Sequence, residues 1–396
     1  MRSRPGPELA VRTHQAPREV VLTGARLVLP DEVVRGTLVL AAGIIRELQP
    51  GRSHLPGAID LEDDFLLPGL IDLHTDSLEK HYQPRRGVEW DPVAAAISHD
   101  TQIAGSGITT VFDSLTLGAA TGWEVRPEMV EPMVAGLRTA LEHGMLRAEH
   151  WLHMRCEVTH PDIVAIFEAH ADDPLVRFMS LMDHAPGDRQ VSDVAAYRQR
   201  FMRLFEADQP TADRHIEELI RASRSFGRDH RRRLARAARE RGMPFASHDD
   251  ASPAHVAEAV ALGAVLAEFP TTRAAARAAR ERGLKVLMGA PNLIRGQSHS
   301  GNLAATTLAA QGELDILSSD YIPASLLQAV FRLTDAPCGW SLPRAVATVA
   351  QAPAAAAGLA DRGRLEPGLR ADLVQVRLIE GHPVVRRVWS NGRRVA

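Results

Sequence analysis

The chain has 396 residues and a formal net charge of -3, and these values exclude several classes of protein. The length is too great for one small domain and suits a large barrel with an appendage, or two ordinary domains. A hydrophobic fraction of 45% with 24% charged residues is typical of globular proteins, which excludes extended disorder. The small net charge argues against nucleic acid as a partner, because such binding depends on bulk positive charge.

Membrane insertion, export and disulfide bonding are not expected either. No apolar run reaches the ~20 residues that a membrane span requires. The first 18 residues are polar, where an export signal needs an apolar stretch. Cys156 and Cys338 are too few for a disulfide framework. We therefore expect a cytoplasmic protein without a membrane partner.

The two ends of the chain have a β-type pattern. Residues 1–19 are rich in Pro, Arg and Gly and are expected to form a flexible extension. Residues 20–67 and 364–396 consist of short apolar runs separated by turns, including a hairpin signal at Asn391-Gly392. Because each end is too short for a stable sheet, we expect them to combine into one small β-sandwich domain.

Residues 68–363 repeat an apolar strand followed by a helix. The expected strands cover residues 67–74, 109–113, 150–157, 176–184, 244–248, 264–269, 284–289 and 314–320. Eight such units predict an α/β fold, a (β/α)8 barrel of the TIM type. An open doubly wound sheet is the alternative, but no Gly-rich phosphate-binding turn follows the first strand. The charged insert at 190–239 is expected to be helical and to lie outside the barrel.

Side chains that can bind a metal ion follow most of these strands, and active sites of such barrels form at the carboxyl ends of the strands. The strand ends carry His74 and Asp76, Asp113, Glu157, Asp183 and His184, His248 to Asp250, Glu268, Asn292 and Asp320. Any one of them alone is more often a helix cap or a satisfied polar group. Imidazoles and carboxylates on several strands of one barrel instead predict a site for a borderline divalent metal.

Two features refine this expected metal site. Alternate residues of a strand face the same side, so His74 and Asp76 can hold one ion. Two-metal barrel hydrolases often use a carboxylated lysine as the bridge, but the chain has only two lysines. Lys285 begins a strand and Lys80 is expected in a loop beyond the first strand. Glu157 is therefore the expected bridging carboxylate, and Lys80 either binds an anion or lies on the surface.

Several segments along the chain carry a family pattern. They include Leu-Pro-Gly-Leu-Ile-Asp-Leu-His at 67–74 and Ser-Ser-Asp at 318–320. The chain resembles the amidohydrolase superfamily, and within it the branch that acts in phosphonate degradation by the carbon–phosphorus lyase pathway. The residues closest to that branch are 73–80, 98–100, 106–111, 181–184, 246–250, 267–272, 287–292 and 295–302. Asp76 replaces the second histidine of the common His-x-His motif. The number of bound ions, one or two, therefore stays open, and manganese or iron are alternatives to zinc.

The resemblance implies metal-dependent hydrolysis of a phosphoanhydride. The expected substrate is α-D-ribose 1-methylphosphonate 5-triphosphate, which water would split into the 5-phosphate and pyrophosphate. A divalent metal, zinc in first place, would acidify the water, and Asp320 would accept its proton. Asp320 and His248 are the expected catalytic residues. The expected metal ligands are His74, Asp76, Glu157, His184, His248 and Asp320.

A polyphosphate substrate requires cations and backbone donors in its pocket. Residues 295–302 follow the seventh strand and combine a guanidinium, small residues, hydroxyls and an imidazole. The expected contacts of this anionic, phosphorylated sugar are Lys80, Arg295, Ser298, His299 and Asn302. A plain flexible loop is the alternative interpretation of residues 295–302.

Two other functions remain open from the residues. A deaminase or cyclic-amide hydrolase would use the same metal site, but an amide substrate gives no reason for the anion-ready segment at 295–302. A non-catalytic barrel scaffold should have lost its strand-end ligands, and this chain retains them. A homo-oligomer is a further possibility that the sequence does not decide.

Overall fold

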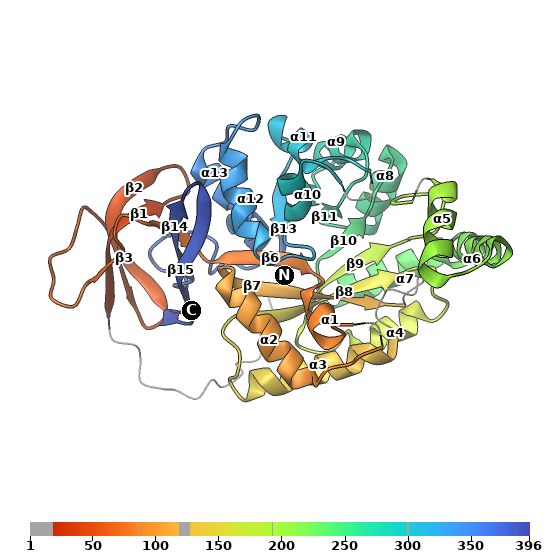
Figure 1. Ribbon diagram of the computed structural model, residues 1–396, viewed down its shortest axis with the longest axis horizontal. Coiled ribbons are helices and arrows are strands. Elements are labelled where there is room, and N and C mark those ends of the chain that lie inside the picture. Colours follow the sequence, from red (N-terminus) through yellow and green to blue (C-terminus); the bar gives the residue numbers. More distant parts are fainter. Residues whose placement is uncertain (1–18, 86, 119–126, 192, 299–300) are drawn as a thin grey trace.

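The computed structural model describes residues 19–85, 87–118, 127–191, 193–298 and 301–396. Its largest unit is a parallel sheet of eight strands, rolled into a barrel in the order β13-β12-β11-β10-β9-β8-β7-β6 (Figure 1). These strands are β6 (Leu70–Thr75), β7 (Ile108–Leu117), β8 (Glu149–Glu157), β9 (Val176–Met182), β10 (Phe245–His248), β11 (Leu266–Glu268), β12 (Lys285–Gly289) and β13 (Ile316–Ser318). All eight predicted strands are present.

The barrel is nearly closed between its first and last strands. Just beyond them, the Asp76 amide donates to the Asp320 carbonyl at 2.8 Å, and the Asp320 amide donates to the His74 carbonyl at 3.0 Å. Closure places the carboxyl ends of β6 and β13 side by side. Residues far apart in the sequence therefore meet at the mouth of the barrel.

Helices surround the barrel because the sequence alternates strands with capped, one-sided helices. The helix α9 shows the pattern: Thr272 caps its amino end by accepting from the Ala275 amide. Its arginines face solvent, whereas four of its alanines are buried, namely Ala275, Ala276, Ala278 and Ala279. The helices of this layer are α1 (Ser77–Tyr82), α2 (Pro92–Gly105), α3 (Pro127–Glu142), α4 (Ile163–His170), α7 (Arg228–Glu240), α8 (Pro253–Leu262), α9 (Arg273–Glu281), α10 (Ala290–Arg295), α11 (Ala305–Ala310), α12 (Ser325–Thr334), α13 (Leu342–Ala347) and α14 (Gln351–Ala356). In the described ranges, no helix combines the length and apolar character that a bilayer span requires.

Two apolar cores hold the barrel together. Inside the strands, Leu73, Phe112, Phe178 and other side chains fill the lumen. A larger core lies between the strands and the helices. The barrel is thus a packed scaffold, and space for a substrate remains only at its ends.

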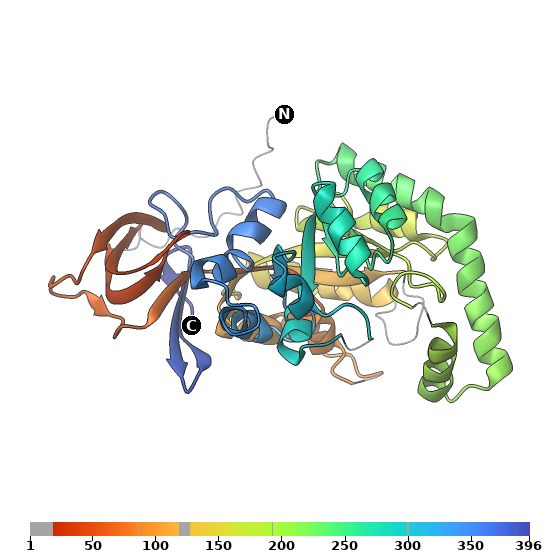
Figure 2. The same cartoon turned by 90° about the horizontal axis from the view of Figure 1, so that it is seen from above.

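The insert at 190–239 is helical, as its charge pattern predicts. It forms α5 (Val194–Phe205), α6 (Gln209–Ala222), the π-helical turn η1 (Ser223–Gly227) and α7. The α5–α6 hairpin projects from the barrel (Figures 1 and 2). The prediction that the whole insert lies outside the barrel is wrong for α7, which packs against α4, α8 and β9 and belongs to the helix layer.

Both ends of the chain contribute to one separate sheet, which confirms that part of the predicted fold. Its order is β16-β15-β14-β5-β1-β2-β3, with β4 beside β1, and most of its pairs are antiparallel. The strands are β1 (Val20–Val28), β2 (Val33–Ala41), β3 (Ile44–Pro50), β4 (Ile59–Asp60), β5 (Phe65–Pro68), β14 (Leu373–Ile379), β15 (His382–Ser390) and β16 (Arg393–Arg394). This sheet has its own apolar core. The domain limits given above remain a prediction, and residues 1–18 of the expected extension lie outside the described residues.

Only Gly69 separates β5 of this sheet from β6 of the barrel. A Cβ atom at Gly69 would lie 2.2 Å from Oγ1 of Thr109 and 2.9 Å from Cβ of Asp372. Both distances are too short for any side chain. The glycine therefore allows the sheet and the barrel to pack closely where the chain passes between them.

Candidate active site

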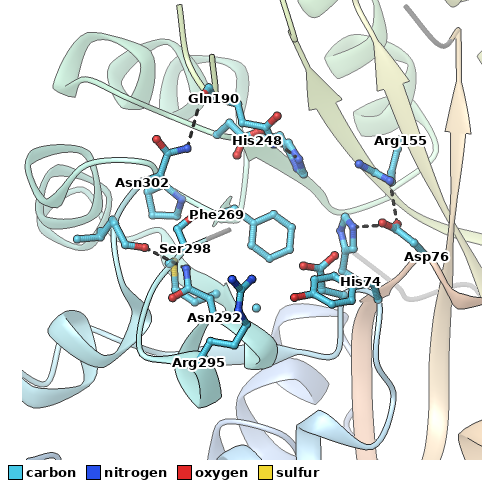
Figure 3. A pocket seen from close by; sticks show the side chains of 17 residues that line it. His74, Asp76, Arg155, Gln190, His248, Phe269, Asn292, Arg295, Ser298 and Asn302 are labelled. Carbon is cyan, nitrogen blue, oxygen red and sulfur yellow. Dashed lines mark hydrogen bonds and ion pairs between the residues drawn. The ribbon is translucent and has the colours of Figure 1, made fainter. Parts of the chain in front are cut away.

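A cavity of about 470 Å³ opens at the carboxyl ends of the barrel strands (Figure 3). It receives side chains from the first, third, fifth and last strands and from the segment after β12. Its lining comprises His74, Asp76, Arg155, Gln190, His248, Asp249, Phe269, Pro270, Met288, Gly289, Asn292, Arg295, Ser298, Asn302, Leu303, Asp320 and Tyr321. The cavity therefore combines imidazoles, carboxylates and guanidinium groups.

The buried carboxylate of Glu268 orients two histidines of this cavity. His74 Nδ1 lies 2.9 Å from Oε1 of Glu268, and His248 Nδ1 lies 2.9 Å from Oε2. Burial alone would raise the pKa of Glu268, but the neighbouring His74 and His153 and the hydrogen bonds from His248 and His74 hold it well below its usual range. An ionised Glu268 accepts from both Nδ1–H groups, so each Nε2 atom is left with a lone pair for a metal ion.

One group of potential metal ligands consists of His184, His248 and Asp249. The Nε2 atoms of His184 and His248 lie 3.5 Å and 3.4 Å from Oδ2 of Asp249. That oxygen is buried and, within the described part of the chain, has no hydrogen-bond partner. Three donor atoms thus converge on one region without bonding to one another. Two imidazoles and one carboxylate fit a borderline divalent cation such as zinc.

A second group consists of His74, Asp76 and Asp320. His74 Nε2 lies 3.4 Å from Oδ1 of Asp76. The same oxygen accepts a hydrogen bond from Nη1 of Arg155 at 2.8 Å, so a guanidinium adjoins this group. Burial, together with the charge of Asp76, raises the pKa of Asp320 to about 7. These donors also fit a divalent cation, but the permanent positive charge of Arg155 lies beside them.

Glu157, the predicted bridging carboxylate, lies behind His184 and does not line the cavity. Its Oε2 is 2.8 Å from Nδ1 of His184, and its Oε1 accepts from the Thr159 hydroxyl at 2.8 Å. His184 is therefore held by Glu157 much as His248 is held by Glu268. The structure brings together the other five predicted ligands, in two groups, and places Glu157 at their edge.

The predicted substrate contacts lie around the cavity. Arg295, Ser298 and Asn302 line it, and Asn302 Nδ2 donates to the Gln190 carbonyl at 3.3 Å. Lys80 lies in the helix α1 instead of a loop, and its Nζ donates to the carbonyl of Tyr321 at 3.1 Å. His299 lies outside the described residues.

Sequence reasoning missed three contributors. Arg155 lies two residues before Glu157. Because alternate residues of a strand face the same side, both lie on one face of β8, and this pattern could have identified Arg155 as a cavity residue. Asp249 was recognised at its strand end but was not assigned to the ligand set, and Glu268 was not given its orienting role. Asp113, counted among the strand ends, lies within β7 and faces the helix layer, where it bonds His99 of α2.

The comparisons with known proteins agree with this barrel and its site. The family model described as "Amidohydrolase family" matches residues 65–395, and the chain belongs to this family. The chain is also 44% identical over 377 residues to the α-D-ribose 1-methylphosphonate 5-triphosphate diphosphatase of Escherichia coli strain K12. That match covers 95% of this chain and all of the relative. The resemblance seen in the sequence is thereby confirmed.

Solved structures of lower identity share the fold. N-acetyl-D-glucosamine-6-phosphate deacetylase of Mycobacterium smegmatis, as its D267A mutant, superposes with a TM-score of 0.62 at 17% identity, covering 95% of this chain and 99% of the other. A 5-methylcytosine deaminase of Klebsiella pneumoniae gives a TM-score of 0.64 at 13% identity, covering 96% and 98%. At such identities the likeness concerns the fold alone.

Proposed function

We propose that this chain is a metal-dependent hydrolase that converts α-D-ribose 1-methylphosphonate 5-triphosphate to the 5-phosphate and pyrophosphate. The observation that carries the proposal is the 44% identity to the diphosphatase of Escherichia coli, which extends over nearly the full length of both chains. The cavity supports it, because it offers metal ligands and a guanidinium within one space. Both are suited to a substrate with several phosphates.

A divalent cation, for which we propose zinc first and manganese or iron as alternatives, would polarise the phosphoryl group and lower the pKa of a bound water. The proposed ligands are His184, His248 and Asp249, with His74, Asp76 and Asp320 as the neighbouring group. Glu157 and Glu268 would hold the ligand imidazoles in place through their Nδ1 atoms.

Asp320 is the proposed proton acceptor. It follows the last strand and lines the cavity, where its side chain is partly buried. Burial favours the neutral carboxyl group, so an ionised Asp320 there is a stronger base than in water. Held beside the reacting phosphorus, this carboxylate would take the proton of the attacking water and orient its oxygen. Arg295 would bind the phosphates that leave as pyrophosphate.

The second candidate is hydrolysis of an amide or deamination, the activities named for the solved structures that share the fold. Arg295 favours the phosphate substrate, because its guanidinium lines the cavity together with Ser298 and Asn302. A small neutral amide carries no negative charge for this guanidinium to bind.

Reconstituted enzyme tests the proposal directly. The protein, stripped of metal and then loaded with zinc, manganese or iron, is assayed for pyrophosphate release from the ribose triphosphate and for hydrolysis of an N-acetyl amino sugar phosphate and a cyclic amide. We expect pyrophosphate release that requires metal and is lost in Asp249→Asn. Turnover of amide substrates alone would replace the proposed function by the second candidate.

Two further proposals concern the setting of the enzyme. The two cysteines are both free thiols, one of them fully buried, which fits a reducing compartment, and we propose the cytoplasm. We also propose a homo-oligomer, without nucleic-acid or membrane partners. Sedimentation of the purified chain tests the assembly state.

A further inference from the structure

Arg155 is a partly buried guanidinium at the edge of the cavity, and no role discussed above requires it. It lies on β8, lines the cavity together with Asp76, and its side chain is 14% exposed. Within the described ranges, the side chain of Arg155 donates two hydrogen bonds, both from Nη1. One goes to Oδ1 of Asp76 at 2.8 Å and the other to Oγ1 of Thr116 at 3.4 Å. In Figure 3 its head group points at the carboxylate of Asp76.

This ion pair uses the oxygen that a metal ion would need. Oδ1 of Asp76 is the atom that faces Nε2 of His74. An ion bound to that oxygen would lie about 2 Å from it, and therefore at most about 5 Å from Nη1 of Arg155. Two positive charges at that distance repel each other, and the repulsion is stronger than in bulk water because protein replaces much of the surrounding solvent.

Asp249 differs because, among the described residues, it forms no ion pair with a guanidinium. Against the effect of burial, the charge of Arg155 nevertheless helps to lower the pKa of Asp249. In the part of the chain that the structure describes, the ion pairs of Asp249 involve only His184 and His248. Its Oδ2 is buried and unbonded. An imidazole can lose its proton to make room for a metal, whereas a guanidinium stays charged at any working pH. The two groups of ligands are therefore unequal, although their donor atoms are similar.

We propose that the Arg155 guanidinium takes the place of a second metal ion, so that the site holds a single divalent cation at His184, His248 and Asp249. This inference rests on the metal dependence in the proposed function. Asp76 then serves to hold Arg155 at the mouth of the barrel. The fixed charge of Arg155 faces the cavity and supplies the positive potential that a second ion would otherwise provide to a polyphosphate.

Metal content measured without substrate tests this proposal. Wild-type protein and variants are saturated with Mn²⁺, freed of excess ion, and analysed by inductively coupled plasma mass spectrometry and electron paramagnetic resonance. Wild type should bind one ion per chain and give an uncoupled manganese spectrum. Arg155→Met removes the charge and should bind two ions, with a spin-coupled spectrum. Arg155→Lys retains the charge and should bind one.

Three further variants locate the ion and control for folding. Asp76→Asn should still bind one ion, whereas Asp249→Asn should bind none. Arg295→Met also removes a cavity cation but does not contact Asp76, so it should bind one. Two ions in wild type, one ion in folded Arg155→Met, or loss of the ion in Asp76→Asn would each overturn the proposal. If Arg155→Met does not fold, the ion counts of wild type, Asp76→Asn and Asp249→Asn still show whether the protein holds one ion and whether that ion lies at Asp249.

The ion count is independent of the substrate assigned above. A protein with the expected counts but no pyrophosphate release would overturn the proposed function and leave the role of Arg155 in place. A protein that releases pyrophosphate while holding two ions would overturn the role of Arg155 and leave the proposed function in place.

Discussion

The Nδ1 atom of His248 lies 2.9 Å from Oε2 of Glu268, and the other oxygen of this carboxylate holds His74 at the same distance. Glu268 thus sets the orientation of two imidazoles that enter the cavity from different strands. A carboxylate that accepts from Nδ1 also fixes the tautomer in which Nε2 can bind a metal.

Glu268→Gln should therefore weaken metal binding about 10- to 100-fold. The amide nitrogen cannot accept a hydrogen bond, so one of the two histidines loses its partner. Competition with a chelating dye measures the affinity. Glu281→Gln, an exposed change on α9, is the matched control. Equal affinities in the two variants would contradict the orienting role.

Asp320→Asn should lower kcat about 10²- to 10⁴-fold, because an amide cannot take the proton of the attacking water. The backbone at Asp320 has a φ of 56°, a left-handed conformation that asparagine tolerates well. Circular dichroism should therefore show an intact fold. A variant with nearly full kcat would exclude Asp320 as the proton acceptor.

Arg295→Gln should raise KM for the triphosphate substrate about tenfold, with a smaller effect on kcat. The guanidinium lines the cavity, and a hydrogen bond between charged groups contributes more than a neutral one. Initial rates over a range of substrate and salt concentrations check this. The dependence of KM on salt should become weaker in the variant. Arg282→Gln changes an exposed arginine at the end of α9 that does not line the cavity, and it should leave KM unchanged.

A buried network outside the cavity should make stability depend on pH. Asp113 lies 2.6 Å from Nε2 of His99 and 2.8 Å from Nδ1 of His150, whose Nε2 is 3.3 Å from Asp100. Burial alone would lower the pKa of His150, but the charge of Asp113 and the contacts with Asp100 raise it to about 9. The folded state therefore binds this proton more tightly than the unfolded chain.

The stabilisation is complete below pH ~6.5 and is lost as the pH rises through about 9. His150→Gln should lower the melting temperature by about 2–4 °C at pH 6 and by less at pH 9.5. Thermal melts at both values, with exposed His143→Gln as the control, measure the difference. A constant deficit across this range would show that only packing is lost.

Gly69→Ala should destabilise the protein by about 1–3 kcal/mol, because the added methyl group collides with Thr109 and Asp372. Gly105, at the end of α2, is the matched control. A Cβ there meets no atom within 4 Å, so Gly105→Ala should be neutral or slightly stabilising. Chemical unfolding of both variants checks the contrast. Equal stabilities would mean that the contact between sheet and barrel relaxes at no cost.

Much of this protein could be predicted from local patterns. Alternation of apolar strands with capped helices identifies the eight-stranded barrel, and the β-type ends identify the second sheet. Residues such as His74, His248 and Asp320 could be named because strand ends meet at one side of a barrel. The family could be recognised from its motifs, and the match over residues 65–395 agrees.

Other features depended on distances between strands, which no local pattern contains. The period of β8 places Arg155 and Glu157 on one face, but only the folded chain brings Arg155 against Asp76 and turns Glu157 toward His184. Backbone pattern determines the direction of a side chain, whereas its partner depends on barrel closure and on the rotamers that packing allows. The sequence by itself therefore determined the barrel and its candidate ligands, and the tertiary structure decided which of them share their space with a fixed positive charge.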